Sequence, residues 1–140
     1  MKKLLLFLSV VSSLAAICQV SENDILGVWM TELKDGKIEI YKKNNLYFGK
    51  IVWIAKPNDE SGNPILDSKN PDNSLNNRPL MGIDIISKMT FTGKEWSGGE
   101  IYDPKSGDTY TCKLWFENGL LKVRGYLGWL FDTKTWTKVS

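Results

Sequence analysis

Hairpin turns recur along this chain and divide most of it into short segments of strand-like character. Asn118-Gly119 is the strongest turn signal, because both residues readily adopt the positive φ of a two-residue hairpin turn. Asn44-Asn45 supplies a second tight turn. The run Asp-Pro-Lys-Ser-Gly at 103–107 supplies a third, in which proline fixes φ and glycine ends the turn. Segments joined by such turns pair with their sequence neighbours, so the chain is restricted to antiparallel sheet.

Between the turns, apolar and polar residues alternate with the period of two that half-buried strands show. Segment 108–117 is the clearest case, with Tyr110, Cys112 and Leu114 on one face. No segment shows helical periodicity over the dozen residues that a helix requires. We expect strands over eight segments: 25–32, 36–43, 46–55, 80–91, 94–102, 108–117, 120–126 and 133–139.

Eight short strands in a meander favour a closed barrel, because closure removes both exposed edges of the sheet. We therefore expect an all-β fold: a single eight-stranded antiparallel up-and-down barrel that forms one domain over residues 19–140. A barrel of this size is filled by its own side chains or holds one small ligand.

Two finer features are predicted within this pattern. Ile51, Trp53 and Ala55 alternate on one face of segment 46–55, and Gly98-Gly99 predicts a bulge or bend. From 56 to 79 the pattern stops in a segment rich in proline, asparagine and aspartate. A loop of this length is either functional or disordered in most compact domains.

Residues 1–18 have the composition of a cleavable signal peptide. Two lysines precede an uncharged run over 4–17, which is shorter than the about 20 apolar residues needed to span a bilayer. Small residues at Ala16 and Cys18 favour cleavage after Cys18. We expect an exported protein, periplasmic or extracellular, with no transmembrane segment. Lipid anchoring at Cys18 is the alternative, disfavoured because the preceding Ile17 is bulky.

Cleavage there leaves 16 basic and 16 acidic residues, a net charge of zero. A neutral protein has no general attraction to nucleic acid, so we expect no nucleic-acid partner. Cys112 is then the single cysteine, which precludes an internal disulfide.

A set of short motifs runs through the predicted barrel. They are Gly27-x-Trp29, Gly49-Lys50-Ile51-Val52-Trp53, Asp67-x-Lys69-Asn70-Pro71, Gly99-x-Ile101-Tyr102-Asp103-Pro104, Gly107-x-Thr109-Tyr110, the run 121–128, and Thr135-Trp136-Thr137. This pattern resembles a family of small exported bacterial proteins, the domain of unknown function numbered 2147. The resemblance implies a lipocalin-like (calycin) barrel in the cell envelope, without an established activity. Lys138 stands where an arginine is common in that family.

The chain contains no histidine, which disfavours the Ser-His-Asp and Cys-His arrangements and the commonest zinc ligand. Cys112 lacks a basic neighbour on its own strand face, so we interpret it as a small core residue rather than a nucleophile. We expect no catalytic residue, no metal and no cofactor.

The 56–79 loop offers oxygen atoms that suit calcium, from Asp67, Asn70 and Asp72 among others. Their spacing does not match an EF-hand, and such residues also cap ordinary turns, so the capping interpretation is favoured. An enzyme built on Asp67, Asp103 and Arg124, with two carboxylates and a guanidinium, is a further alternative. In the structural interpretation Asp103 caps its turn and Arg124 stacks on an aromatic ring such as Trp29.

Six tryptophans are many for a chain of this length. We expect a non-enzymatic envelope protein whose barrel binds a small, mostly apolar ligand, with a filled-barrel module for envelope protein partners as the alternative. The segment 128–131 is taken as a connection whose large apolar side chains seal a barrel end or contact a ligand or partner. The candidate ligand-binding residues are Trp29, Trp53, Tyr102, Asp103, Arg124, Tyr126 and Trp129.

Overall fold

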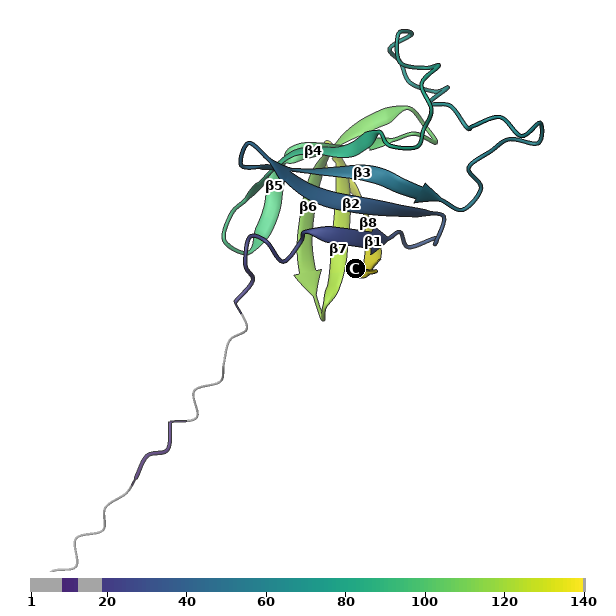
Figure 1. Cartoon of the computed structure of the whole chain (residues 1–140). Coiled ribbons are helices and arrows are strands. Elements are labelled where there is room, and N and C mark those ends of the chain that lie inside the picture. Colours follow the sequence, from purple (N-terminus) through teal and green to yellow (C-terminus); the bar gives the residue numbers. More distant parts are fainter. Residues whose placement is uncertain (1–8, 13–18, 140) are drawn as a thin grey trace, which may run out of the picture.

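Eight antiparallel strands close into one barrel in the computed structural model, which describes residues 9–12 and 19–139 (Figure 1). Each strand pairs with its neighbours in sequence, and the last pairs with the first. The predicted fold class is therefore confirmed. The strands are β1 (Gly27–Met30), β2 (Gly36–Lys43), β3 (Leu46–Ile54), β4 (Asp84–Phe91), β5 (Glu95–Asp103), β6 (Asp108–Glu117), β7 (Leu120–Leu127) and β8 (Leu130–Lys138).

Most of the predicted signal peptide lies outside the described residues, since only 9–12 of its eighteen are described. Within the described ranges, no helix has the length and apolar character needed to cross a membrane.

The predicted hairpin turns are confirmed by their backbone angles. Asn44 and Asn45 have φ of 52° and 61°, and Asn118 and Gly119 have φ of 53° and 76°. Positive φ at both central positions gives a turn whose twist matches that of the flanking strands. Asparagine and glycine adopt this conformation at little cost, which explains why the β2–β3 and β6–β7 hairpins form at these positions.

The hydrophobic core fills one end of the barrel, where the β2–β3, β4–β5 and β6–β7 turns lie. Its largest buried side chains include Trp29, Tyr47 and Trp96, and the ring of Trp96 lies 4.9 Å from that of Phe91. Ile25, just before β1, has no exposed surface and accepts a hydrogen bond of 2.8 Å from the Trp29 indole. We call this packed end the closed end.

The seam between β1 and β8 is short. Only two residue pairs join these strands, Trp29 with Lys138 and Met30 with Thr137, whereas seven pairs join β7 to β8. Side chains reinforce the seam: the Lys138 ammonium donates to the Leu26 carbonyl at 2.6 Å and lies 4.6 Å from the centre of the Trp29 ring. The Glu32 carboxylate also accepts a hydrogen bond of 2.9 Å from the backbone of β8.

The prediction that Trp53 shares a face with Ile51 is wrong. A register shift places Lys37 opposite Trp53 but Ile38 opposite Ile51, so one extra residue of β3 is accommodated between these pairs. Such a bulge reverses the alternation of side chains beyond it. Ile51 is buried, whereas Trp53 is 38% exposed on the outer face, where the Lys37 ammonium lies 5.1 Å from its ring centre. The predicted irregularity at Gly98-Gly99 is confirmed as a shift of register between β5 and β6.

Several strand boundaries differ from the sequence-based prediction, and the largest differences are at the starts of β8 and β4. Leu130 and Phe131 belong to β8, so the connection after β7 is reduced to Gly128 and Trp129. The long loop extends over 55–83, and these described residues hold two isolated bridges but no strand. In Figure 1 this loop projects from the barrel beyond the end of β3.

Candidate functional site

A cavity of about 400 Å³ opens at the other end of the barrel, opposite the closed end. Strands of an up-and-down barrel alternate in direction, so odd-numbered strands finish and even-numbered strands begin at the same end. The cavity is therefore surrounded by the last residues of β5 and β7, the first residues of β4, β6 and β8, and the β1–β2 loop. We call this end the open end.

The wall of the cavity is apolar. It is formed by inward-facing side chains from strands β4 to β8: Ile85, Ile101, Tyr110, Val123 and Trp136. Gly125 also faces inward, and a Cβ atom there would lie 3.3 Å from the Cβ of Tyr110. The absence of a side chain at this position lets the Tyr110 ring pack against β7 without filling the cavity.

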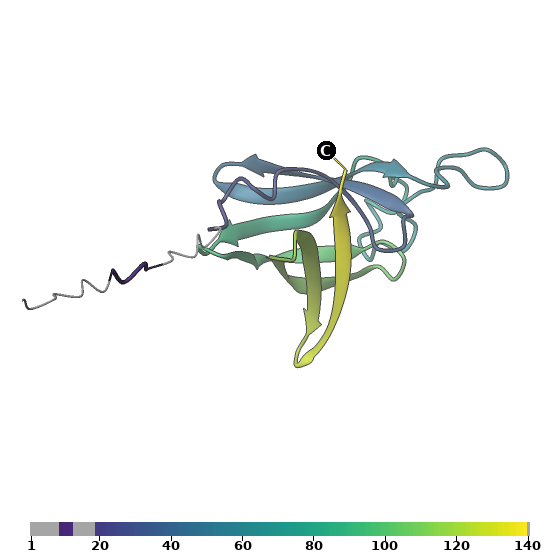
Figure 2. The same cartoon turned by 90° about the horizontal axis from the view of Figure 1, so that it is seen from below.

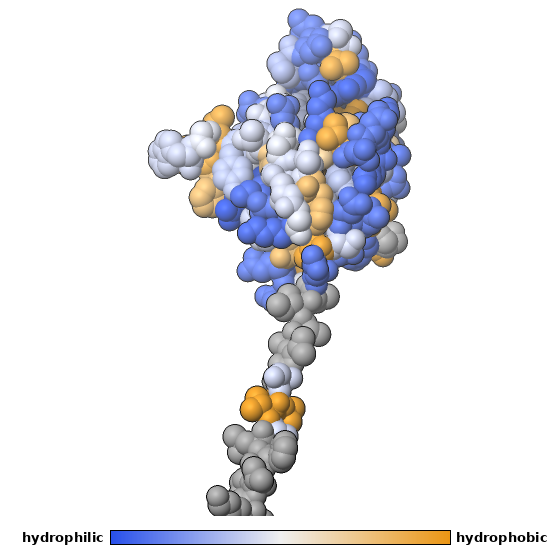
Figure 3. All heavy atoms as spheres, turned by 90° about the vertical axis from the view of Figure 1, so that its left-hand side faces the viewer, coloured by the Kyte–Doolittle hydropathy of each residue, from blue (hydrophilic) through white to orange (hydrophobic). Residues whose placement is uncertain are grey.

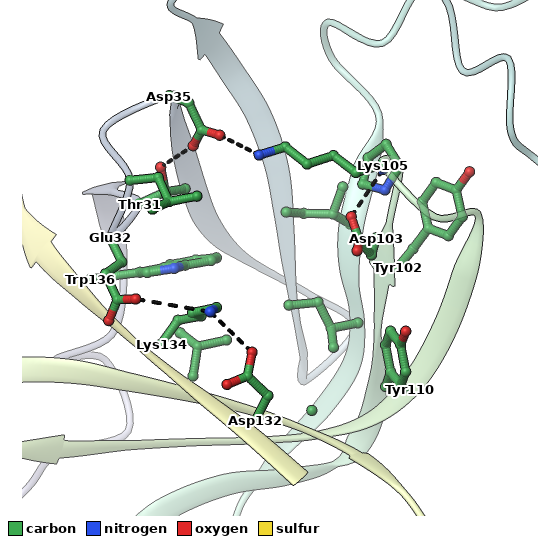
Figure 4. Close-up of a pocket in the computed structure, with 16 residues that line it drawn as sticks. Thr31, Glu32, Asp35, Tyr102, Asp103, Lys105, Tyr110, Asp132, Lys134 and Trp136 are labelled. Atoms are coloured by element: carbon green, nitrogen blue, oxygen red, sulfur yellow. Dashed lines mark hydrogen bonds and ion pairs between the residues drawn. The ribbon is translucent and has the colours of Figure 1, made fainter.

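Charged residues surround the opening, as Figure 4 shows. They comprise four carboxylates and two ammonium groups: Glu32, Asp35, Asp103, Asp132, Lys105 and Lys134. The shortest of the ion pairs at the opening joins the β1–β2 loop to the β5–β6 turn, with Lys105 Nζ 2.6 Å from Asp35 Oδ2. This hydrogen bond from Lys105 lowers the pKa of Asp35 below its usual value.

A second charged group lies on β8. Lys134 Nζ is 3.1 Å from Asp132 and 4.0 Å from Glu32, and its hydrogen bond to Asp132 raises the pKa of the ammonium group. Asp103 instead caps its own turn, accepting from the Lys105 amide at 2.9 Å and from the Ser106 hydroxyl at 3.2 Å. Every carboxylate at the opening is thus already bonded to a donor of the protein.

Two predicted ligand-binding residues, Tyr102 and Asp103, do lie at this cavity. Others lie elsewhere. Trp29 is buried at the closed end, and Trp53 lies on the outer face of β3. The tip of the β7–β8 hairpin carries Trp129, which is 87% exposed.

Arg124 and Tyr126 lie on the outer face of β7. Side chains alternate along a strand, and Val123 and Gly125 face the cavity. The Arg124 guanidinium stacks 4.7 Å from the Trp115 ring centre and 4.2 Å from that of Phe131. The sequence-based suggestion that it stacks on Trp29 is wrong, since Lys138 occupies that position. Arg124 does stack on aromatic rings, but these rings belong to the two neighbouring strands, β6 and β8.

Asp67 forms the centre of a separate polar cluster on the outside of the barrel wall. It has no exposed surface and accepts hydrogen bonds from Tyr102 at 2.6 Å, from Asn70 at 2.8 Å and from Arg78 at 3.0 Å. Burial and the hydrogen bond to Asp67 raise the pKa of the Tyr102 phenol to about 12. The cluster fastens the long loop to β5.

Asp72 lies further along this loop and caps a turn, accepting hydrogen bonds from the amide and hydroxyl of Ser74. Asn70 likewise accepts from the Asp72 amide at 2.9 Å. In the described part of the chain, no three Asp, Glu, Cys or His side chains gather closely enough to hold a metal ion.

The structure does not bring Asp67, Asp103 and Arg124 together. Asp67 is enclosed by its own donors, Asp103 caps a turn, and Arg124 stacks on outer-face rings. Among the described residues, no hydrogen bond or ion pair joins any two of the three. Cys112 is 4% exposed beside Leu114, and burial raises the pKa of its thiol to about 12, as the core interpretation requires.

Most residues of the cavity were not found from the sequence. The residues of the apolar wall and of the Asp35–Lys105 pair belong to ordinary strand and loop patterns, which carry no local sign of a cavity. A usable signal existed in the topology: inward-facing residues at the ends of odd strands and the starts of even strands must meet at one end of the barrel. Applied to β5, β6 and β7, this rule selects Ile101, Tyr110 and Gly125.

Comparisons with known proteins agree with this architecture. The model of the DUF2147 family, described as an uncharacterized protein conserved in bacteria, matches residues 27–138. The structure is similar to protein HP1028 from the human pathogen Helicobacter pylori, described as belonging to the lipocalin family. That similarity has a TM-score of 0.72 at 21% sequence identity and covers 84% of each chain, so it establishes a lipocalin-like fold. No curated protein matches the chain.

Proposed function

The chain belongs to the DUF2147 family of bacterial proteins, and for this member we propose a binding function: its barrel holds one small, mostly apolar molecule. The observation that carries this proposal is the cavity of about 400 Å³ with an apolar wall at the open end. Small-molecule sites have volumes of roughly 300–1,000 Å³ and combine apolar walls with a few polar groups. An eight-stranded barrel is just wide enough to hold one such ligand.

The two ends of the barrel support a binding protein over a filled-barrel interaction module. A filled barrel would carry large side chains through its whole length, as this one does at the closed end with Trp29 and Trp96. At the open end Gly125 replaces such a side chain, and the space between Ile85, Ile101 and Val123 is left free. The charged opening would keep a polar group of the ligand in contact with water.

We further propose that the protein acts outside the cytoplasm, in the periplasm or beyond it. The support is the sequence of residues 1–18, with its two lysines and uncharged run. Intact-mass measurement on protein isolated from its own host tests this. A polypeptide beginning at Gln19 is expected, whereas a retained Met1 would contradict export and a lipid mass on Cys18 would indicate anchoring.

The binding function is tested with N-phenyl-1-naphthylamine, a neutral apolar probe that becomes fluorescent in apolar surroundings. We expect saturable binding with one probe per barrel. Val123→Phe should fill the cavity and weaken binding about tenfold or more, because a large side chain takes the space of the ligand. Thr111→Phe, which places the same side chain on the exposed outer face of β6, is the matched control and should bind normally.

Two results would overturn the proposal. One is the absence of saturable binding by the unaltered protein. The other is equal binding by the Val123→Phe and Thr111→Phe proteins, which would place the probe outside the cavity.

A further inference from the structure

The tip of the β7–β8 hairpin exposes an unusual amount of apolar surface. Leu127, Trp129, Leu130 and Phe131 are 64%, 87%, 54% and 59% exposed, and they occupy five consecutive positions with Gly128. Figure 2 shows this hairpin standing out from the barrel, and in Figure 3 its tip forms a projection at the left-hand side. We call residues 127–131 the apolar tip.

The apolar tip is apolar on both faces of the hairpin. Leu127 pairs with Leu130 on the face of the hairpin that is continuous with the inner face of the barrel. Tyr126 pairs with Phe131 on the outer face. A strand at a protein surface normally turns one polar face to water. Here Trp129 completes the end of the hairpin, so no face of the tip is polar. Such a tip is suited to an apolar environment that can contact both faces and the end of the hairpin together.

The charged side chains nearest the apolar tip are Asp132 on β8 and Arg124 on β7. The Asp132 carboxylate lies 3.1 Å from the Lys134 ammonium, which compensates its charge. Arg124 donates to the Thr133 hydroxyl at 2.7 Å, and no carboxylate of the described residues lies within ion-pair distance of its guanidinium. The Arg124 guanidinium therefore has donors that are not used in an ion pair, and it lies 4.2 Å from the centre of the Phe131 ring at the base of the apolar tip.

From this arrangement we infer that the apolar tip docks on a lipid bilayer, inserting 127–131 into the interface while Arg124 contacts lipid phosphate groups. Apolar residues of peripheral proteins enter the interface by about 5–10 Å. At about 3.3 Å per strand residue, Arg124 lies about 13 Å from Gly128, at the level of the headgroups when the tip is inserted to that depth. Tryptophan is favoured at this boundary, and cationic residues near it are attracted to anionic lipids.

The shape of the tip argues against a second copy of the chain as the occupant. Stable protein interfaces bury about 800 Å² on each partner. A narrow two-residue turn with four exposed side chains presents a convex end that cannot supply such an area against another barrel. A bilayer needs no complementary groove, because it deforms around the inserted side chains. The inference does not depend on which ligand the cavity binds.

Flotation with vesicles tests the inference, using protein that begins at Gln19 and so retains every strand and core residue. Vesicles of phosphatidylcholine alone and with phosphatidylglycerol are compared. Trp129→Ser should reduce the vesicle-bound fraction about tenfold or more, since a large apolar side chain no longer leaves water. Trp53→Ser, at an exposed tryptophan on β3, is the matched control and should float like the unaltered protein. Arg124→Gln should reduce the gain from phosphatidylglycerol about fivefold.

An unchanged β-sheet circular dichroism spectrum and unfolding midpoint show that each variant is folded, so this test does not require the cavity to bind a ligand. The inference is overturned if the unaltered protein does not float with either vesicle. It is equally overturned if Trp129→Ser and Trp53→Ser float alike. Loss of self-association in Trp129→Ser, with vesicle binding unchanged, would assign the tip to a second copy instead.

Discussion

Asp67 is a carboxylate without solvent exposure, and it is stable there because donors from three residues surround it. A buried charge without such partners would cost several kcal/mol. Tyr102 supplies the donor from the barrel, whereas Asn70 and Arg78 supply donors from the loop. The side chain that the sequence offered as an acid or a metal ligand is therefore the attachment of a long loop to the barrel wall.

Replacing Asp67 by asparagine should change the titration of Tyr102. The raised pKa of about 12 favours the neutral phenol in the folded protein, so this stabilisation is complete below pH 10 and is lost as the pH rises through 12. In Asp67→Asn we expect the pKa of Tyr102 to fall towards 10, together with a loss of about 1–3 kcal/mol in the free energy of unfolding at pH 7. NMR of ring-labelled tyrosine, assigned with Tyr102→Phe, measures the first quantity.

Asp84→Asn is the matched control. Tyr41 donates to Asp84 at 2.7 Å, and burial with this hydrogen bond raises its pKa to about 12 as well. This variant should lower the pKa of Tyr41 and leave that of Tyr102 unchanged. An unaltered Tyr102 titration in Asp67→Asn would show that the buried hydrogen bond has no influence on the phenol.

The strands are the level at which sequence-based prediction succeeds best. Alternation within 108–117 and the asparagine turns are local features, so the boundaries of β2 and β6 follow from neighbouring residues alone. The face of Trp53 is not local, because it depends on a bulge that only the pairing of β2 with β3 reveals. The cavity depends on contacts between residues even further apart in the sequence. Lys105 and Asp35 are 70 positions apart and meet only when the barrel closes.

The glycine pair in β5 gives a prediction for a single element. A Cβ on Gly99 would overlap the backbone oxygen of Ser87 and lie 2.6 Å from the sulfur of Met89. Gly98 has a φ of 80° but no atom within 4 Å of a Cβ placed there. We expect Gly99→Ala to lower the free energy of unfolding by about 3 kcal/mol through overpacking, and Gly98→Ala by about 1 kcal/mol through its backbone angle. Urea unfolding of both proteins measures the difference; equal losses would contradict a steric role for Gly99.

Across the whole molecule, the largest buried side chains and the cavity lie at opposite ends of the barrel. The tryptophan-rich core fills the closed end, while the cavity at the open end is bounded by loops and turns. Empty space in the cavity costs packing free energy, which the closed end must offset. Ile85, Val123 and Trp136 line the cavity and also belong to the hydrophobic core, so substitutions there should change both the proposed binding and the stability of the barrel.

Closure of the barrel provides a prediction at the same scale. Lys138→Met keeps the aliphatic stem but removes the hydrogen bond to the Leu26 carbonyl and the cation over the Trp29 ring. We expect a loss of about 1–2 kcal/mol in the free energy of unfolding. Lys138→Arg should retain most of the stability of the unaltered protein. Lys56→Met, at an exposed loop lysine, should not change the free energy of unfolding. Equal stability of the Lys138→Met and Lys56→Met proteins would contradict this role for Lys138.

The shortness of the β1–β8 seam has a consequence for the behaviour of the protein at high concentration. If the two pairs that join these strands separate, both strands expose unpaired backbone groups of the kind that recruit strands from other molecules. Because Lys138 and Glu32 fasten the seam through side chains, they also protect the protein from strand exchange and aggregation. We therefore expect resistance to aggregation in this fold to depend on two charged side chains that lie outside the hydrophobic core.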